Sequence, residues 1–208
     1  MITAQDIQHG FGKRAHDLVE LFDKTNKLST FMRKLIKQSE IDPIRYDKDK
    51  YTGDGFEFLM EIFIKVSEFD TRVGISKYEP VQTDDNGVDG IGCNLINEKC
   101  AIQIKFRSNV TTTLTANQDH LSNFITDAMF KYKIVAPEKN TDIFRHYIFT
   151  TAEGLNFYTD ANMFKGFVKC YGNTDLRFFL DGNIHFWDLC RTIAKEIKNG
   201  KTNGTTNA

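Results

Sequence analysis

The sequence predicts a mixed α/β protein with a mixed central sheet and helices on both faces of that sheet. Apolar residues recur at helical spacing near both ends of the chain. Two apolar runs, residues 88–96 and 100–106, are separated by three polar residues, which is typical of a β-hairpin. Helix-like and strand-like segments then alternate along the chain. A hairpin followed by such alternation favours a mixed sheet.

The N-terminal part of the chain is predicted to be helical over residues 13–39, with a break near Thr25 and Asn26. Ser29 is expected to cap the second of these helices. The polar face of the second helix is basic, which is typical of a solvated helix face and also fits a surface that contacts phosphate groups. The basic side chains are Lys27, Arg33, Lys34 and Lys37.

A second predicted helix carries several glutamates. Residues 41–52 are polar and are expected to form a turn before this helix, which covers residues 54–69. Glu57, Glu61 and Glu68 fall largely outside its apolar stripe. This position places their carboxylates away from the expected core.

The remaining elements are predicted from shorter patterns. Besides the hairpin, strands are expected at residues 73–81, 146–151, 167–171 and 176–180. Thr115 and Gln118 have the spacing of a capping box and predict the start of a helix that continues to Tyr132. Further helices are expected at residues 160–165 and 184–197.

These elements divide the chain into three predicted parts. Residues 1–52 form an N-terminal helical extension, residues 53–198 form the core domain, and residues 199–208 form a disordered tail. The tail is mostly Gly, Asn, Thr and Lys, so it has too few apolar residues to order itself.

Composition excludes several classes of protein. Of the 208 residues, 40% are hydrophobic and 26% are charged, which is typical of globular proteins rather than disordered or fibrous ones. No apolar stretch is long enough for a membrane span, and the N-terminus lacks the apolar segment of a signal peptide.

The four cysteines form no CxxC pair, so we expect reduced thiols in a cytoplasmic protein rather than a zinc ribbon. The net charge of −1 does not indicate a strongly basic nucleic-acid binder, although the distribution of charge matters more than its sum.

The most informative segment is the hairpin. Asp89 starts its first strand, and Gln103 and Lys105 lie two apart on its second strand, so these two side chains share one face. Ile102 and Ile104 point to the other face and are expected to enter the core. The short turn brings Asp89 opposite Lys105. A carboxylate, an amide oxygen and an ammonium group therefore converge at the open end of the hairpin.

This group of residues suits phosphodiester hydrolysis. Hard oxygen ligands such as the Asp89 carboxylate hold Mg²⁺, and the ion activates water and neutralises charge on the phosphate. Lys105 can orient or deprotonate the water, or stabilise the pentacovalent phosphorane. Glu57 is the best candidate for a further carboxylate ligand. Gly87 and Gly90 are expected to let the backbone turn and a bulky anion approach.

Simpler roles fit the same residues. Asp89 and Lys105 also fit a buried structural ion pair, Gln103 an ordinary polar residue of a strand, and Glu57 a solvated helix face. Asp84 and Asp85, which precede the hairpin, are more typical of a turn than of a metal site.

The motifs in this region resemble a known family. The pattern Gly87-x-Asp89-Gly90 followed by Gln103-x-Lys105 resembles the Mrr-like branch of the PD-(D/E)xK nuclease superfamily. That branch often carries Gln-x-Lys where the wider superfamily has Asp/Glu-x-Lys. Phe56-Glu57 resembles its N-terminal helix, whose glutamate approaches the metal, and residues 147–152 resemble its fourth core strand. The resemblance covers about residues 53–198 and implies a restriction-endonuclease-like fold.

The resemblance also implies a function. It implies a DNA endonuclease that depends on Mg²⁺, with Mn²⁺ as an alternative ion. Glu57, Asp89 and Gln103 would hold the metal, and Lys105 would assist the attacking water. Arg107, Ser108 and Asn109 follow Lys105 directly, and this position fits either contacts with the DNA strand that is cut or an ordinary polar loop.

The resemblance does not cover the N-terminal helices, which are expected to supply further DNA contacts or dimerisation. It does imply a homodimer, because double-strand cleavage by this fold commonly needs two active sites. The alternative is a DNA-binding or assembly module with a weak or inactive nuclease-like site, since position 103 lacks the acidic residue of the wider superfamily.

Overall fold

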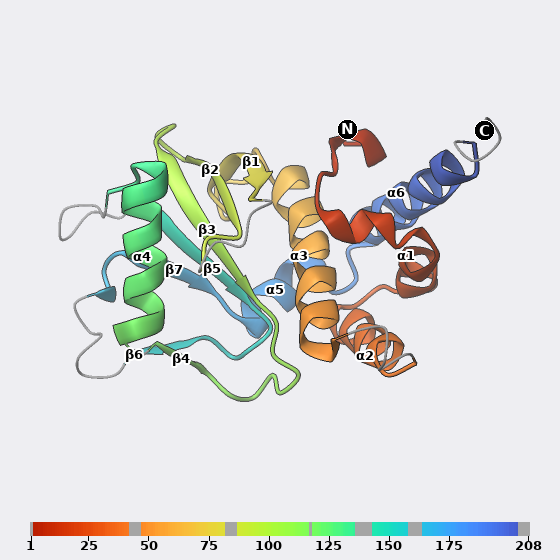
Figure 1. Ribbon diagram of the computed structural model, residues 1–208, viewed down its shortest axis with the longest axis horizontal. Coiled ribbons are helices and arrows are strands. Elements are labelled where there is room, and N and C mark those ends of the chain that lie inside the picture. The colour runs from red at the N-terminus through yellow and green to blue at the C-terminus, as the bar shows by residue number, and fades with distance from the viewer. Residues whose placement is uncertain are drawn as a thin grey trace. The chain divides into compact units, whose positions relative to one another are not determined.

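The computed structural model describes residues 2–41, 47–81, 87–116, 118–135, 143–157 and 164–203. The chain divides into two compact units. The helical unit comprises Met1–Val66 and Leu176–Ala208, and the sheet unit comprises Ser67–Asp175 (Figure 1). The predicted boundary after residue 52 falls inside a helix that covers Lys48–Val66. The N-terminal and C-terminal helices belong to the same unit.

The helical unit contains the elements that were predicted near both chain ends. The helices are η1 (Ala4–Asp6), η2 (Gly10–Lys13), α1 (Ala15–Phe22), α2 (Leu28–Ser39), α3 (Lys48–Val66) and α6 (Ile184–Asn203), and α5 (Asn173–Leu180) crosses the boundary between the units. The predicted break near Thr25 and Asn26 is confirmed. Residues 199–203 belong to α6 and not to a disordered tail, and residues 204–208 lie outside the described residues.

Two helix starts differ from the prediction. Ser29 does not cap α2, because this helix begins one residue earlier, at Leu28, whose N–H donates to Oδ1 of Asp181 at 2.8 Å. The helix expected from residue 54 begins at Lys48 instead. The carboxylate of Asp47 accepts hydrogen bonds from the N–H groups of Asp49 and Lys50, at 2.9 and 3.2 Å, and so caps this earlier start.

Aromatic side chains form the core of the helical unit. Phe22 of α1 stacks on Phe31 of α2 with ring centroids 5.5 Å apart. Trp187 of α6 packs against both rings and donates its indole N–H to the carbonyl of Leu180 at 2.7 Å. These contacts bury apolar area from three helices at one place, which stabilises the unit.

The sheet unit confirms the predicted mixed sheet. Its five strands lie in the order β1 (Ile75–Pro80), β2 (Gly90–Asn94), β3 (Lys99–Lys105), β5 (His146–Thr150) and β7 (Val168–Tyr171). The β1–β2 and β2–β3 pairs are antiparallel, whereas β3–β5 and β5–β7 are parallel. A separate two-stranded parallel sheet pairs β4 (Leu114–Ala116) with β6 (Leu155–Phe157).

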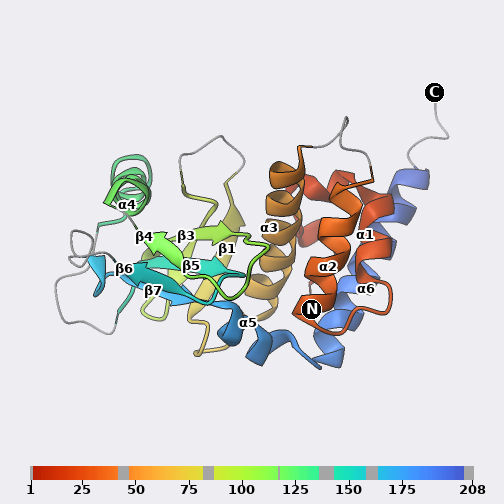
Figure 2. The same cartoon turned by 90° about the horizontal axis from the view of Figure 1, so that it is seen from below.

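One helix covers a face of the five-stranded sheet. Figure 2 shows this helix, α4 (Gln118–Tyr132), nearly end-on and on one side of the strands. Phe124 and Ala128 of α4 share a buried apolar cluster with Ala101 of β3 and Ile148 of β5. The parallel β3–β5 connection therefore follows the usual rule, in which a helix returns the chain to the sheet.

Two predictions of local structure are corrected. The strand expected at residues 176–180 is part of α5, because Leu176 and Leu180 are both buried at the i, i+4 spacing of a helix. Thr115 lies in β4 rather than at a helix cap, and β6 was not predicted. The helix expected at residues 160–165 lies largely outside the described residues.

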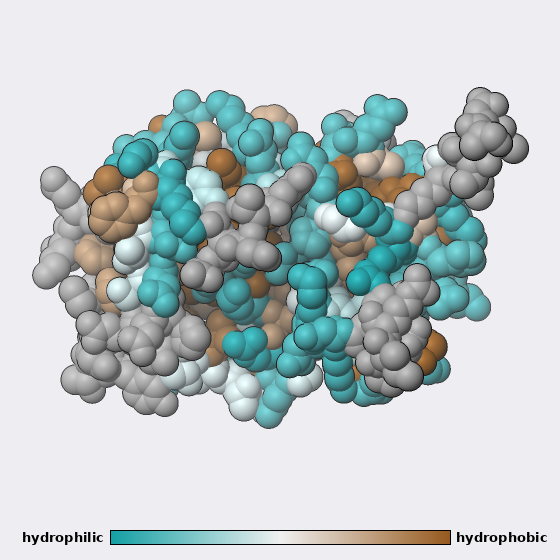
Figure 3. Space-filling model, viewed as in Figure 1, coloured by the Kyte–Doolittle hydropathy of each residue, from teal (hydrophilic) through white to brown (hydrophobic). Residues whose placement is uncertain are grey.

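The helices, the cysteines and the exposed apolar side chains bear on the composition-based expectations. Within the described residues, no helix combines the length and apolarity that a membrane crossing requires. All four cysteines are free thiols, and burial raises the pKa of Cys100 and Cys170 to about 12. Figure 3 shows a largely hydrophilic face with hydrophobic side chains near the end of α4, where Phe130 and Val135 are exposed.

Candidate functional site

Asp89 and Lys105 lie together at the open end of the β2–β3 hairpin. Asp89 directly precedes β2, and its N–H donates to the carbonyl of Ile102 at 2.9 Å. Lys105 is the last residue of β3, and its Nζ lies 3.7 Å from Oδ2 of Asp89. The structure thus brings the carboxylate and the ammonium group together. The register differs from the prediction, because Gly90 pairs with Ile102, which places Asp89 level with Gln103 rather than opposite Lys105.

The backbone fixes the Asp89 carboxylate. The N–H of Ile104 donates to Oδ2 of Asp89 at 2.6 Å. The Asp89 side chain is 15% exposed, whereas that of Lys105 is 34% exposed. The carboxylate is therefore held at the edge of the core, while the lysine end has more access to solvent and to a ligand.

Gln103 lies on the same strand as Lys105 and is held by a local hydrogen bond. Its Nε2 donates to the carbonyl of Gly87 at 2.8 Å, so the other end of the amide, Oε1, is an acceptor. Gly87 has φ of 130°, and a Cβ atom there would lie 2.9 Å from Nε2 of Gln103. A glycine at position 87 is therefore needed for this arrangement.

Gly90 has a different role from the one expected. A Cβ atom at this position would lie 2.3 Å from the ring of Tyr78 on β1. Gly90 therefore makes room for a buried aromatic side chain, and an approaching anion is not needed to explain it.

The two faces of β3 differ as predicted. Ala101 belongs to the apolar cluster beneath α4, so Gln103 and Lys105, which alternate with it, face the same side. Ile102 and Ile104 are buried on the opposite face. The polar pair is therefore carried by a strand whose other face is anchored in the core.

Two threonines at the end of β5 hold the chain that follows Lys105. The hydroxyl of Thr150 donates to the carbonyl of Lys105 at 2.9 Å, and that of Thr151 donates to the carbonyl of Arg107 at 2.8 Å. The N–H of Arg107 donates back to Oγ1 of Thr151 at 2.6 Å. Arg107, Ser108 and Asn109, which were predicted to contact DNA, are exposed in this anchored loop.

A pocket of about 330 Å³ opens beside these residues. Gln103, Lys105 and Arg107 line its charged and polar side. Threonines add hydroxyl groups from the loop and from β4, namely Thr112, Thr113 and Thr115. The candidate site is therefore a concave surface with cations along one part of its wall.

Apolar side chains complete the pocket wall. Leu114 of β4 and Leu155 of β6 come from the two-stranded sheet, Leu121 comes from α4, and Ile148 comes from β5. The sequence carries no signal for Leu114 and Leu155, because β4 and β6 are three-residue strands whose parallel pairing leaves no local pattern.

Glu57 lies on α3 in the helical unit. Its Oε2 is 3.0 Å from Nε2 of His9, and its side chain is 25% exposed. The N–H of Phe11 donates to Nδ1 of His9 at 3.2 Å, so Nε2 carries the proton that faces Glu57. The metal-ligand role of Glu57 stays a prediction.

Glu61, one turn further along α3, is completely buried, contrary to the expectation that it lies outside the core. Its carboxylate accepts hydrogen bonds from the N–H groups of Gln8 and His9, each at 2.9 Å, and pairs with Lys65 at 2.8 Å. This face of α3 is covered by the N-terminal segment, and the buried charge is compensated by these donors.

The predicted basic surface of α2 is smaller than expected. Lys27, Arg33 and Lys37 are exposed. Lys34 differs, because its ammonium group donates to the carbonyls of Glu20 and Asp23 at the end of α1. Burial lowers the pKa of Lys34. It therefore acts as a helix C-cap and is not available as a phosphate ligand.

Oxygen atoms are the donors that this site offers to a cation. In the described part of the chain, no three His, Cys, Asp or Glu side chains gather as a metal-holding group. The Asp89 carboxylate and Oε1 of Gln103 are hard oxygen donors of the kind that Mg²⁺ and Mn²⁺ accept. Asp84 and Asp85 lie outside the described residues.

Comparison with protein-family models, with curated proteins and with solved structures found no match. The fold and the site define a mixed α/β protein with a polar pocket at the open end of a β-hairpin.

Proposed function

We propose that this protein is a metal-dependent DNA nuclease whose reaction centre is formed by Asp89, Gln103 and Lys105. The observation that carries the proposal is the 3.7 Å approach of the Lys105 ammonium to the Asp89 carboxylate at the edge of a pocket. The chain order of a glutamate-bearing helix, three antiparallel strands, a helix and a parallel strand supports it, since the resemblance to the Mrr-like branch implies a similar order.

The donor set is suited to Mg²⁺. This ion is commonly bound through one or two carboxylates together with waters and substrate phosphate. Asp89 would supply the carboxylate, and Gln103 would supply Oε1, because its Nε2 is engaged with Gly87. A bound Mg²⁺ would neutralise phosphate charge and lower the pKa of a water.

Each protein group has a distinct task in the proposed reaction. The Ile104 N–H holds the Asp89 carboxylate in place before substrate binds. Lys105 has the access needed to donate to a phosphate oxygen or to orient the attacking water. Arg107, fixed through its backbone to Thr151, supplies a second cation toward the phosphate backbone.

Cleavage of DNA by single-site variants tests the proposal. Asp89→Asn keeps an oxygen that can accept from Ile104, and Lys105→Met keeps the length of the side chain. Each is expected to reduce Mg²⁺-dependent cleavage of labelled DNA by about 100-fold or more. Lys99→Met makes the same change at an exposed position of the same strand and should cut like the wild type.

The outcomes separate the proposal from its alternative. Equal cleavage by the wild type, Asp89→Asn and Lys105→Met would show that these residues are not the reaction centre. Binding of DNA by all variants without cleavage by any would favour a DNA-binding or assembly module. The homodimer stays a prediction of the resemblance, and the mass of the protein in solution decides it.

A further inference from the structure

We propose that the pocket beside Lys105 receives a single unstacked nucleotide next to the phosphate that is cut. The inference rests on the proposed nuclease function and names its substrate class. DNA with an unpaired nucleotide at the cut site would then be preferred over uninterrupted duplex.

The first argument is the size of the pocket. Its volume of about 330 Å³ is at the small end of the range for ligand-binding pockets in proteins, about 300–1,000 Å³. A pocket of this size suits one nucleotide and does not admit a stacked base pair. A base in continuous duplex would have to leave the stack to enter it, as in enzymes that flip bases.

The second argument is the chemistry of the wall. Lys105 and Arg107 supply positive charge where a phosphate would lie. Leu155 is half-buried and supplies apolar surface of the kind that packs against the faces of a base, and the buried Leu121 and Ile148 line the same pocket. A nucleotide combines an anionic phosphate, a base with apolar faces and polar base edges, so it matches both parts of this wall.

The third argument is the presence of polar groups that can bind base edges. The threonine hydroxyls of the wall can donate or accept, and Gln103 offers Oε1 because its Nε2 is engaged with Gly87. Of the threonines, Thr112 donates its hydroxyl to the carbonyl of Asn109 at 3.0 Å and is fixed. Thr113 is exposed and lines the pocket without belonging to the core.

The test compares two DNA duplexes that differ by one unpaired nucleotide. The wild type is expected to cut the DNA with the unpaired nucleotide about tenfold faster or more, because unpairing no longer opposes entry. Leu155→Trp fills the pocket and is expected to bring this rate ratio close to one. Asn156→Trp adds the same bulk at the exposed next residue of β6 and should keep the wild-type ratio.

A second variant that fills the pocket separates loss of the pocket from loss of the fold. Thr113→Trp adds bulk from an exposed position, and it should lower the ratio while far-UV circular dichroism matches that of the wild type. Equal cutting of the two duplexes by the wild type would overturn the inference. Unchanged ratios in both Leu155→Trp and Thr113→Trp would also overturn it.

A binding measurement distinguishes this inference from the proposed function. DNA that carries 2-aminopurine at the unpaired position is mixed with protein in Ca²⁺, and the fluorescence reports the environment of that base. A fluorescence change with the wild type and Asn156→Trp, but not with Leu155→Trp, supports the pocket even if no DNA is cut. The same signal from Leu155→Trp and the wild type contradicts it.

Discussion

His146, the first residue of β5, has a fully buried imidazole. Its ring lies edge-on to Phe124 of α4, with centroids 5.5 Å apart. Within the described residues, neither ring nitrogen has a hydrogen-bond partner. Burial, with a smaller effect from the neighbouring Arg145, lowers the pKa of His146 to about 4. The ring is therefore neutral in the folded protein at neutral pH.

This histidine predicts a loss of stability in mild acid. The unfolded chain takes up a proton on His146 near pH 6.5, whereas the folded chain does so only near pH 4. The free energy of unfolding should therefore fall as the pH is lowered from 6.5 to 4, by up to about 3 kcal/mol, and the contribution is flat below pH 4. Urea unfolding of His146→Leu over this range should show a shallower fall.

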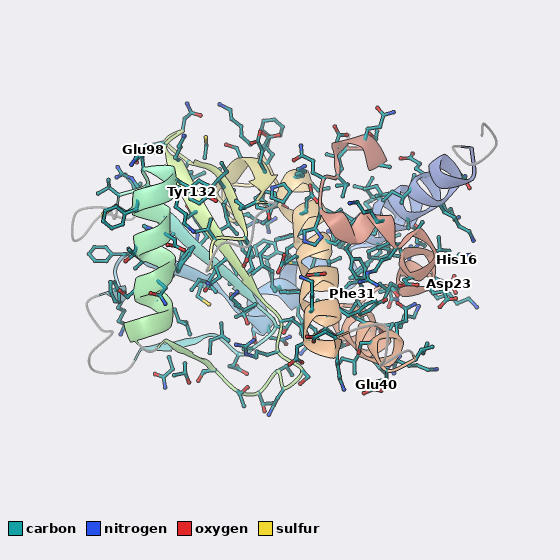
Figure 4. All side chains as sticks on the ribbon, in the orientation of Figure 1. His16, Asp23, Phe31, Glu40, Glu98 and Tyr132 are labelled. Carbon is teal, nitrogen blue, oxygen red and sulfur yellow. The ribbon has the colours of Figure 1, made fainter. Side chains whose placement is uncertain are left out.

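The matched control for this prediction is His16→Leu. His16 is exposed on α1, at the outer edge of the helical unit in Figure 4, so its replacement should leave the pH dependence as in the wild type. If His146→Leu kept the same pH dependence as the wild type, acid sensitivity would have to come from other groups.

At the scale of elements, α2 depends on a cap from a distant part of the sequence. Asp181 lies 153 residues from Leu28 in the sequence, and its carboxylate accepts a hydrogen bond from the Leu28 N–H. Its second oxygen pairs with Arg177 of α5 at 3.1 Å. The sequence predicts Ser29 as the N-cap of α2 because a cap residue is normally next to the helix in the sequence. A cap supplied by a residue far away in the sequence leaves no such local pattern.

Removal of this cap should weaken the helical unit. Asp181→Ala is expected to lower the free energy of unfolding by about 1 kcal/mol, the usual effect of losing a helix N-cap. Asp188→Ala removes an exposed aspartate that pairs with Arg191 and should cost less than about 0.5 kcal/mol. Chemical denaturation measures both, and equal effects would contradict a specific role for Asp181.

Elements with strong local signals were predicted well, and those that depend on distant partners were not. The β2–β3 hairpin and the long amphipathic helices follow from patterns within a few residues. The strand expected at residues 176–180 is helical. A short apolar segment with leucines four residues apart fits a helix and a strand equally well, so the sequence pattern did not distinguish them. The hairpin turn was also found, and Figure 4 shows Glu98 beside it, where its carboxylate pairs with Arg145 at 2.7 Å.

At the scale of the whole molecule, the net charge of −1 hides an uneven distribution of basic groups. Lys27, Arg33 and Lys37 are exposed on or beside α2, while Lys34 is engaged with α1. If the exposed groups contact DNA phosphates, affinity depends on salt, because each contact releases counterions. This dependence can be measured without any assumption about catalysis.

The salt dependence gives a prediction for the triple variant Lys27→Gln, Arg33→Gln, Lys37→Gln. The slope of log affinity against log salt should become shallower, by up to about 0.9 for each lost phosphate contact. Lys34→Gln should keep the wild-type slope, because its ammonium group already serves α1. An unchanged slope in the triple variant, measured by fluorescence anisotropy, would show that this face is only solvated.

The candidate site was predictable only where one hairpin forms it. Asp89, Gln103 and Lys105 meet because a short turn and strand alternation fix their positions, and both can be read from sequence. Leu114 and Leu155 reach the same pocket through pairing of β4 with β6. Such pairing depends on tertiary structure, so the apolar wall that these two residues form could not be predicted from the sequence.

Thr150 and Thr151, which hold the chain at the end of β3, are made later during translation than the hairpin itself. Thr150 lies 45 residues beyond the Lys105 carbonyl that its hydroxyl binds. During synthesis the hairpin leaves the ribosome first, and the parallel partner strand does not yet exist. A nascent chain that stops before residue 151 therefore carries all three proposed reaction-centre residues but not the anchor of the loop that follows them. The loop beside the site can therefore be anchored only after β5 has been made.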